Sequence, residues 1–300
     1  SECLVGSEMC IRDRMKNDEM ITLAKFLAIS GIILPMLPHK NLIPDINLTP
    51  YSIWLATVVV SGISYLSYLL KRYVFHESGV LVSGIIGGLY SSTATISVLA
   101  RKSRKASEQE ANEYVAAMLL AVSMMFLRFM ILILIFSREI FTSIYPYLLI
   151  MSVVAAVVAW FIHSRHRRSK DMTDESEDED SSNPLEFKVA LIFATLFVVF
   201  TVLTHYTLVY AGTGGLNLLS FVSGLSDITP FILNLLQNTG SVAVLVVVAC
   251  SMQAIISNIL VNMFYALFFA GKGSKLRPWI LGGFGTVIGV NLVLLLFFYL

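Results

Sequence analysis

Hydrophobic residues form long uninterrupted runs along this chain, and the charged residues are confined mainly to the stretches between them. A run of about 20 apolar residues has the length of a helix that crosses a bilayer. The runs of this kind are Met20–Leu37, Tyr51–Leu70, Tyr114–Phe136, Tyr145–Ile162, Leu185–Tyr210, Val242–Phe269 and Trp279–Leu300. The pattern predicts an all-α fold, a polytopic transmembrane helical bundle with seven full spans.

Two further apolar segments, Gly79–Leu99 and Gly215–Leu235, are interrupted near their centres by glycine and small hydroxyl residues, which weaken a continuous helix. Irregular backbone at membrane depth is tolerated only where it is buried in protein or lines a water-filled cavity. Each segment is either a full span with a break or a re-entrant loop that enters and leaves the membrane on one side.

The Lys and Arg residues between the spans distinguish these alternatives, because cytoplasmic loops carry an excess of both. Two full crossings would divide the basic residues almost evenly between the two sides. Two re-entrant loops place nearly all of them on one side, with Lys40 and Arg138 as the exceptions. We therefore expect re-entrant segments, a cytoplasmic N-terminus and a C-terminus outside, in a bacterial inner (plasma) membrane.

The two broken segments also match each other at a shift of 136 residues, which aligns Gly88 with Gly224 and Thr93 with Thr229. One span precedes each segment and two spans follow it. Three crossings in the first unit turn the second unit upside down. Inverted repeats with broken helices are typical of transporters, whereas chance similarity between two glycine-rich stretches is the alternative.

Composition agrees with a membrane protein. Hydrophobic residues make up 56% of the 300 residues and charged residues 14%, against roughly 25% charge in soluble proteins. The net charge of +1 gives no electrostatic reason to expect a nucleic-acid partner. A first membrane half over 15–162 and a second over 184–300 flank 163–183, a basic and then acidic stretch predicted to be a disordered cytoplasmic linker.

The first residues, 1–14, read SECLVGSEMCIRDR, and the part from Met9 to Arg14 resembles the translation of a sequencing adapter. Such segments are left out of fold reasoning. We expect native sequence to resume near Met15, in a gene truncated upstream. A genuine short tail is the alternative.

Several segments, in the same order along the chain, resemble one known family. They are PMLP from Pro35, WLATVVVSGISYLSYLL from Trp54, GGLYSSTATISVLARKSR from Gly87, MFLR ending at Arg128, NPLEFKVALIF from Asn183, GLSD ending at Asp227 and SNILVN from Ser257. The chain thereby resembles the integral membrane domains of unknown function numbered 4010 in their series, which often follow an MgtC/SapB-type membrane domain. The resemblance implies residence in the lipid bilayer and an upstream MgtC-like domain as a partner that is missing here.

Arg128 and Asp227 are charged residues embedded in apolar sequence. A mid-membrane arginine costs about 2.5–3.5 kcal/mol on insertion scales, so it needs a partner or water. A guanidinium offers a planar fork that a carboxylate can accept, and we expect the two side chains to pair across the repeat interface. The pair is either a gate or substrate-anion site at Arg128, or a permanent salt bridge that pins two elements together.

Small polar residues complete the candidate substrate or ion pathway. They are Ser91, Ser92, Thr93 and Thr95 in the first broken segment, Thr229 in the second, and Asn258 and Asn262 one turn apart on a later span. Half-helix ends at a break offer free backbone groups to an ion, and hydroxyls supplement them. The alternative is that these residues only pack or hydrogen-bond helices together. The glycines of the breaks, expected to allow close approach of backbone, are Gly87, Gly88 and Gly224.

Two positions depart from the pattern of the family that the chain resembles. Thr229 stands where a second acid is usual, and Asn262 stands where a lysine is usual. We therefore do not expect this chain to use a mechanism that needs those two charges.

The leading functional hypothesis is a transporter or channel-like protein for a small ion or solute. The alternative is a non-transporting accessory or regulatory domain of an MgtC/SapB-type protein. We do not expect an enzyme, because the chain contains no HExxH, GxSxG or P-loop pattern. No cofactor is expected, the sequence defines no metal ligands, and small-residue faces would permit a homo-oligomer.

Overall fold

The computed structural model describes residues 17–43, 46, 48–74, 79–104, 106, 108–164, 187–237, 243–271 and 276–299. Its helices are α2 (Asn17–Met36), α3 (Pro50–Leu69) continued by the π-helical η1 (Leu70–Val74), α4 (Val80–Lys102), α5 (Glu108–Phe136), α6 (Arg138–Ser164), α7 (Phe187–Ser223), α8 (Ile228–Gln237), α9 (Val244–Ala270) and α10 (Arg277–Tyr299). Within these ranges no strand is found, so the all-α prediction is confirmed. The predicted adapter segment 1–14 and all but the first residues of the linker 163–183 lie outside the described residues.

In the part of the chain that the structure describes, 7 helices are long and apolar enough to cross a membrane. They are α3 with most of η1, α4, α5, α6, α7, α9 and α10. The apolar stretches Leu23–Met36 of α2 and Ile228–Gln237, which forms α8, are shorter. These lengths and compositions define a multi-pass membrane protein.

Two helix starts show how local sequence sets the boundaries. Thr49 and Ser52 form a capping box before α3, with Pro50 in the first turn. The Oγ of Ser137 accepts the backbone N–H of Ile140 at 3.4 Å, so α6 begins earlier than the Tyr145 expected from the apolar run. The hydrophobic pattern alone does not predict this start, because the serine cap and the partly polar first turn precede the apolar run.

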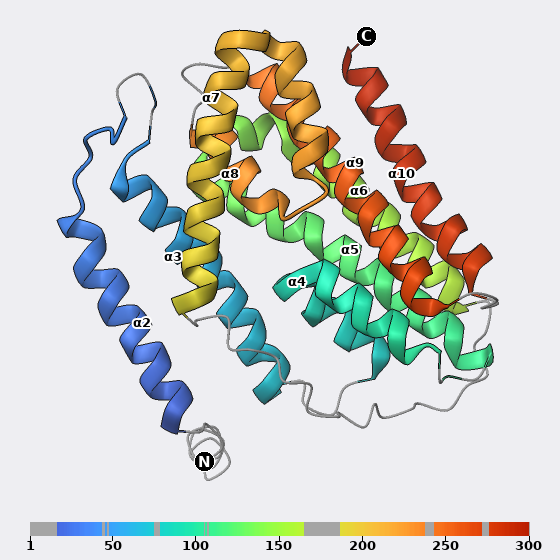
Figure 1. The fold of residues 1–300 in the computed structure, drawn as a ribbon. Coiled ribbons are helices and arrows are strands. Elements are labelled where there is room, and N and C mark those ends of the chain that lie inside the picture. The colour runs from blue at the N-terminus through green and yellow to red at the C-terminus, as the bar shows by residue number, and fades with distance from the viewer. Residues whose placement is uncertain are drawn as a thin grey trace.

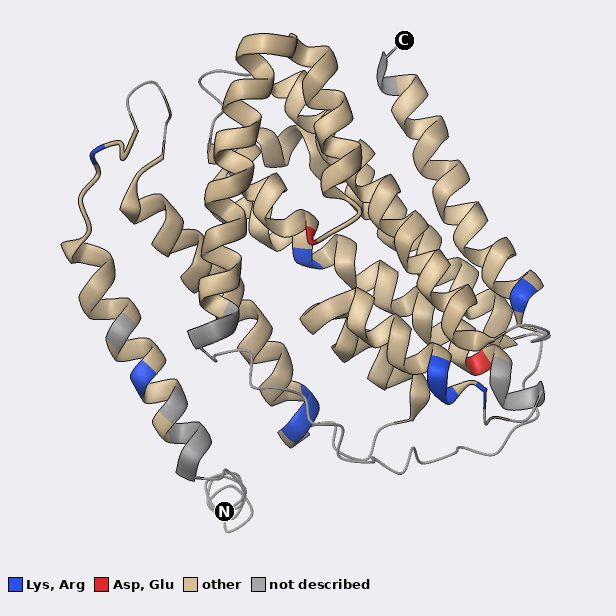
Figure 2. Ribbon diagram, viewed as in Figure 1, with Lys and Arg blue, Asp and Glu red and all other residues tan. Residues whose placement is uncertain are grey.

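The helices α5 and α6 pack closely against each other, and α4 packs along α5 (Figure 1). α9 and α10 lie beside them, whereas α2 packs against α3 at the edge of the bundle. Figure 2 shows that the Lys and Arg positions gather mainly at helix ends, above all at the end of the bundle where η1 stops and α4 starts and finishes. Basic residues therefore mark one end of the described helices.

Candidate functional site

α4 is bent back on itself at Ser91, whose φ of −157° and ψ of 105° are not helical. A Cβ added to Gly87 would lie only 2.5 Å from the Oγ1 of Thr95. Residues eight positions apart in a straight helix are about 12 Å apart, so the two legs of α4 must lie side by side. The Oγ of Ser91 accepts the N–H of Ala94 at 3.4 Å and caps the second leg. The first broken segment is a helical hairpin with its tip at Ser91.

The second broken segment forms another hairpin (Figure 1). α7 reverses at Gly212, where φ is 59° and ψ is −153°, and its last leg ends at Ser223. After the turn 224–227, α8 runs back beside it. Each leg has about ten residues and is about 15 Å long, which is half of the roughly 30 Å hydrocarbon core of a bilayer. The legs of this hairpin are therefore too short to cross a membrane singly.

Contacts between each hairpin and the next long helix recur at a spacing of 136 residues. A Cβ on Gly88 would lie 2.5 Å from the Cα of Ala121, and a Cβ on Gly224 would lie 2.5 Å from the Cβ of Ser257. The same spacing relates two further contacts, Gly84 against Ala117 and Ser220 bonded to Gln253. Gly88 and Gly224 thus lie where a side chain would collide with the next long helix, whereas Gly87 lies against the side chain of Thr95 within its own hairpin.

Arg128, on α5, reaches the tip of the first hairpin. Its Nη1 donates a hydrogen bond of 2.9 Å to the carbonyl oxygen of Tyr90, one of the carbonyls that a helix end leaves without an internal partner. Its Nε is buried and has no hydrogen-bond partner among the described residues. The charge of Asp227 acts on the guanidinium, although no direct ion pair joins the two within the described part of the chain. Figure 2 shows one basic and one acidic position approaching each other at mid-height of the bundle.

Asp227 ends the turn at the tip of the second hairpin. Its Oδ1 accepts the backbone N–H of Thr229 at 3.0 Å and so caps α8. The residue is exposed, as are Leu225 and Ser226 in the same turn. A carboxylate is costly against lipid tails, so an exposed aspartate between apolar helices requires water or a polar partner.

Asn258, on α9, reaches the same turn. Its Nδ2 donates to the carbonyl oxygens of Gly224 at 3.3 Å and Ser226 at 3.5 Å, and its Oδ1 accepts from the Nδ2 of Asn262 at 3.1 Å. Ser226 stands 136 positions after Tyr90. The corresponding carbonyl at each tip is therefore bonded by a side chain of the following long helix, an arginine in one case and an asparagine in the other.

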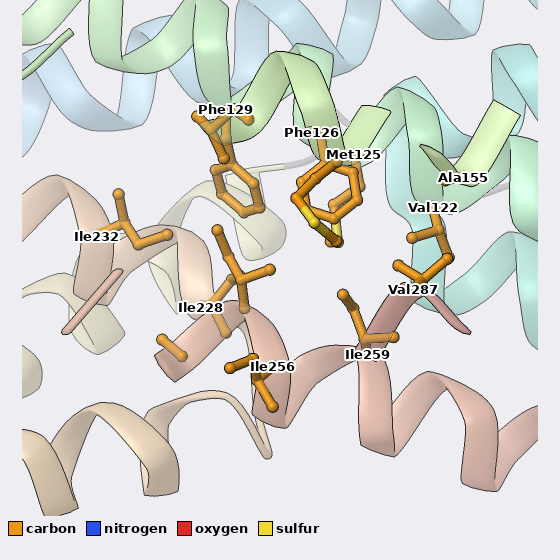
Figure 3. Packing of buried hydrophobic residues seen from close by; sticks show 14 of the residues in the cluster. Val122, Met125, Phe126, Phe129, Ala155, Ile228, Ile232, Ile256, Ile259 and Val287 are labelled. Atoms are coloured by element: carbon orange, nitrogen blue, oxygen red, sulfur yellow. The ribbon is translucent and has the colours of Figure 1, made fainter. Parts of the chain in front are cut away.

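Apolar residues from five helices pack together in the core of the bundle (Figure 3). Phe129, the neighbour of Arg128, and Ile228, the neighbour of Asp227, are both at most 3% exposed. The other labelled side chains are Val122, Met125 and Phe126 of α5, Ile232 of α8, Ile256 and Ile259 of α9, Ala155 of α6 and Val287 of α10. This packing holds α5 against α8 through the sequence neighbours of Arg128 and Asp227.

The other residues predicted for the pathway make fewer contacts with Arg128 and Asp227. Ser92, Thr93 and Thr95 are half-buried in the second leg of α4, and no hydrogen bond joins them to Arg128 within the described residues. Thr229 is buried, and its backbone rather than its side chain bonds Asp227. No group of three His, Cys, Asp or Glu side chains that could hold a metal ion occurs in the described ranges.

Two polar groups that bond to the hairpins were not predicted from the sequence. The carbonyl of Tyr90 is a backbone group, and its role depends on where α4 breaks. Asn234 of α8 donates to the Oγ1 of Thr204 at 2.8 Å and to the carbonyl oxygen of Phe200 at 3.3 Å. The role of Asn234 could have been predicted from its place within an apolar run, because a polar side chain there must bond to a neighbouring helix.

The comparisons with known proteins agree with this fold. The family described as "Domain of unknown function (DUF4010)" matches residues 58–270, which include both hairpins. A relative from Aquifex aeolicus (strain VF5), named "Uncharacterized protein", is 27% identical over 221 residues, covering 73% of this chain and 94% of the relative. No solved structure matches.

Two helical hairpins among long apolar helices, with charged and amide side chains at their tips, define a multi-pass helical membrane protein. Over most of its length the chain carries the sequence pattern of one family. It belongs to the DUF4010 family.

Proposed function

We propose that this protein is a transporter or channel-like protein for a small ion or solute, built as an inverted repeat with hairpins that enter from opposite sides. The observation that carries the proposal is the recurrence of the hairpin contacts at 136 residues, with Arg128 between the two tips. Half-helices that meet near the midplane are a common construction of transporter sites.

The element order supports the repeat. α5 begins at Glu108 and α9 begins at Val244, again 136 residues apart. α3 with η1 corresponds in the same way to the first leg of α7, and α6 corresponds to α10 within a few residues. An odd number of crossings in the first unit makes the second unit its inverse in the membrane.

Buried polar atoms without partners support a hydrated pathway at the tips. Among the described residues they include Arg128 Nε, Ser257 Oγ and Asn262 Oδ1. An unsatisfied buried polar atom costs free energy, so a membrane protein that needed only stability gains nothing from keeping these three. Water or a passing solute would satisfy them.

The orientation follows from the positive-inside rule. The basic end of the bundle is assigned to the cytoplasm and the end of α10 to the opposite side, in a bacterial inner membrane. The segment 163–183 then lies in the cytoplasm with the start of α2.

The test is reconstitution of the full chain in liposomes, with flux measured for a panel of small ions: H⁺, Na⁺, K⁺, Cl⁻ and phosphate. We expect flux of at least one ion, and a loss of at least about tenfold in Arg128→Ala and Asp227→Ala. Lys25→Ala is the control, because Lys25 is exposed on α2. Flux that is unchanged in both site variants would overturn the assignment of the pathway.

Absence of flux for every ion, combined with stable co-purification with an MgtC/SapB-type protein, would instead favour an accessory role. In that case the tips would be structural joints between the halves.

A further inference from the structure

We propose that an anionic phospholipid binds where the end of α4 meets the end of α9, with its phosphate held by Arg101 and Arg104 and one acyl chain lying along exposed rings of α9. This surface is at the far end of the second leg of α4 from the tip at Ser91. The inference therefore does not depend on the proposed function, and it can be tested without measuring transport.

Arg101 and Arg104 lie on the same face of the end of α4. The backbone N–H of Arg104 donates to the carbonyl oxygen of Arg101 at 3.2 Å, so the last helical turn extends to Arg104. Side chains three residues apart on such a turn are neighbours. Both arginines are exposed, and neither forms an ion pair with a carboxylate in the described part of the chain. Their two positive charges are therefore available to an anion from outside the chain.

The end of α9 holds both guanidinium groups in place. The Nη2 of Arg104 donates to the carbonyl oxygen of Phe268 at 3.1 Å. The guanidinium carbon of Arg101 lies 4.4 Å from the centre of the Phe269 ring, over its face. A Cβ on Gly271, where φ is 91°, would lie 3.3 Å from the Nε of Arg104. The arginines are thus positioned by protein contacts before any ligand arrives.

These contacts leave most of the hydrogen-bond donors unused. A guanidinium carries five N–H donors. Arg104 commits Nη2 to a carbonyl, and Arg101 makes no hydrogen bond within the described residues, since a ring face accepts its charge instead. The planar fork of an arginine matches two phosphate oxygens at once. Two such forks on one face define a phosphate-binding surface.

An exposed apolar strip leads away from the arginines along α9. Phe264 and Phe268 are one turn apart, and their stacked rings have centroids 6.1 Å apart. The two side chains are 60% and 62% exposed. Phe268 is the residue whose carbonyl bonds Arg104, so the strip begins directly beside the charged surface. An acyl chain lying on these rings would bring its headgroup to the arginines.

This end of the bundle has the features of a membrane–water interface. α9 ends at Ala270 and α10 begins at Arg277, with Trp279 in its first turn. Figure 2 shows basic positions at the end of α4 and at the start of α10 on the same end of the described helices. Tryptophan and basic residues are typical of the headgroup level. The arginines are therefore placed at the depth of lipid phosphates.

An anionic phospholipid is the occupant that fits both parts of the surface. A free phosphate ion would use the arginines alone, and a lipid without net charge would leave one positive charge or more unmatched. Arg101 and Arg104 belong to the first half of the chain, whereas α9 belongs to the second. A phosphate bound to both arginines should therefore also stabilise the contact between the two halves.

The test is native mass spectrometry of the full chain in a neutral detergent, titrated with phosphatidylglycerol and, separately, with phosphatidylcholine of the same acyl chains. We expect tighter binding of phosphatidylglycerol. The double variant Arg101→Gln/Arg104→Gln should lower that affinity by at least about tenfold, because each basic residue near a lipid surface adds to its attraction for anionic lipid. Equal binding of the two lipids by the wild type would overturn the proposal.

The matched control for charge is the double variant Lys40→Gln/Lys71→Gln, which removes the same charge from two exposed positions on other elements. It should keep the affinity of the wild type for phosphatidylglycerol. A loss equal to that of the arginine variant would show diffuse attraction by net charge and no defined surface.

The apolar strip gives a second variant that leaves both arginines in place. Phe264→Ala/Phe268→Ala should weaken binding of phosphatidylglycerol, whereas Phe297→Ala on α10, which is 76% exposed, should not. This comparison keeps the proposal falsifiable if the arginine variant fails to fold. An unchanged affinity in the double phenylalanine variant would remove the acyl-chain part of the site.

Melting temperatures in the same detergent separate the lipid from a soluble anion. Phosphatidylglycerol should raise the melting temperature of the wild type and leave that of Arg101→Gln/Arg104→Gln unchanged. Inorganic phosphate should have no comparable effect on the wild type. Stabilisation by inorganic phosphate as large as that by the lipid would assign the arginines to a soluble anion and overturn the proposal.

Discussion

The Nη1 of Arg128 lies 2.9 Å from the carbonyl oxygen of Tyr90, so that α5 closes the open end of the first leg of α4. The carbonyl of Tyr90 is one of those that the end of a helix leaves without an internal partner. The guanidinium also lies within the electrostatic influence of Asp227 on the second hairpin.

Replacing Arg128 by methionine should lower the free energy of unfolding by about 1–3 kcal/mol, because the carbonyl of Tyr90 loses its partner. Arg128→Lys should lose less, since it keeps a charge and a donor. The neighbouring variant Leu127→Met conserves volume and is the control. The measurement is thermal or denaturant unfolding in detergent, and a more stable Arg128→Met would contradict the expectation.

Gly88→Ala should destabilise the protein by about 1–3 kcal/mol, as overpacking does. The new methyl group would lie 2.5 Å from the Cα of Ala121, and a backbone atom cannot relieve this clash by rotating as a side chain can. Gly285→Ala on α10 is the matched control, because a Cβ there has open space. Equal melting temperatures for the two variants would show that α4 and α5 are not in this contact.

Gly212→Ala should cost about 1–3 kcal/mol for a different reason. Its φ of 59° and ψ of −153° lie in a region that is almost exclusive to glycine, although nothing stands within 4 Å of an added Cβ. Gly214→Ala, two residues later, also has open space and no positive φ. Unfolding of the two variants side by side isolates backbone strain from packing.

Cysteine labelling from each side of the membrane tests the hairpins directly. In a background with Cys3, Cys10 and Cys250 changed to serine, single cysteines are placed at the ends of each hairpin, in the variants Gly79→Cys, Ala106→Cys, Thr213→Cys and Ala243→Cys. We expect the first two to react from the cytoplasm and the last two from outside. Members of one pair reacting from opposite sides would mean that the hairpin crosses the membrane and that the repeat is not inverted.

Much of the fold could be predicted because it follows from hydrophobic runs and their interruptions. The glycine and hydroxyl residues around Ser91 marked the first break, and the GLSD sequence ending at Asp227 marked the second. The gap between the predicted segments Leu185–Tyr210 and Gly215–Leu235 contains Gly212, where α7 reverses, although the structure forms this reversal without an intervening loop.

The sequence predicted which residues form the candidate site better than it predicted the hydrogen bonds that they make. Asn258 and Asn262 do contact each other, as their one-turn spacing suggested. The direct pairing expected for Arg128 and Asp227 is not present in the described residues, since the arginine bonds the carbonyl of Tyr90 instead. Which group Arg128 bonds depends on how far each hairpin extends along α5, and the hydrophobic pattern of the sequence does not determine that distance.

The dependence of the second hairpin on α9 has a consequence for biogenesis. The backbone of Gly224 rests on Ala254 and Ser257, and the carbonyls of its turn are bonded by Asn258, all of which are translated after the hairpin. When the hairpin leaves the ribosome, its polar tip has none of these partners. We therefore expect the turn to reach its final packing only after α9 has been synthesised, and a chain that stops before Val244 lacks Asn258, the partner of these carbonyls.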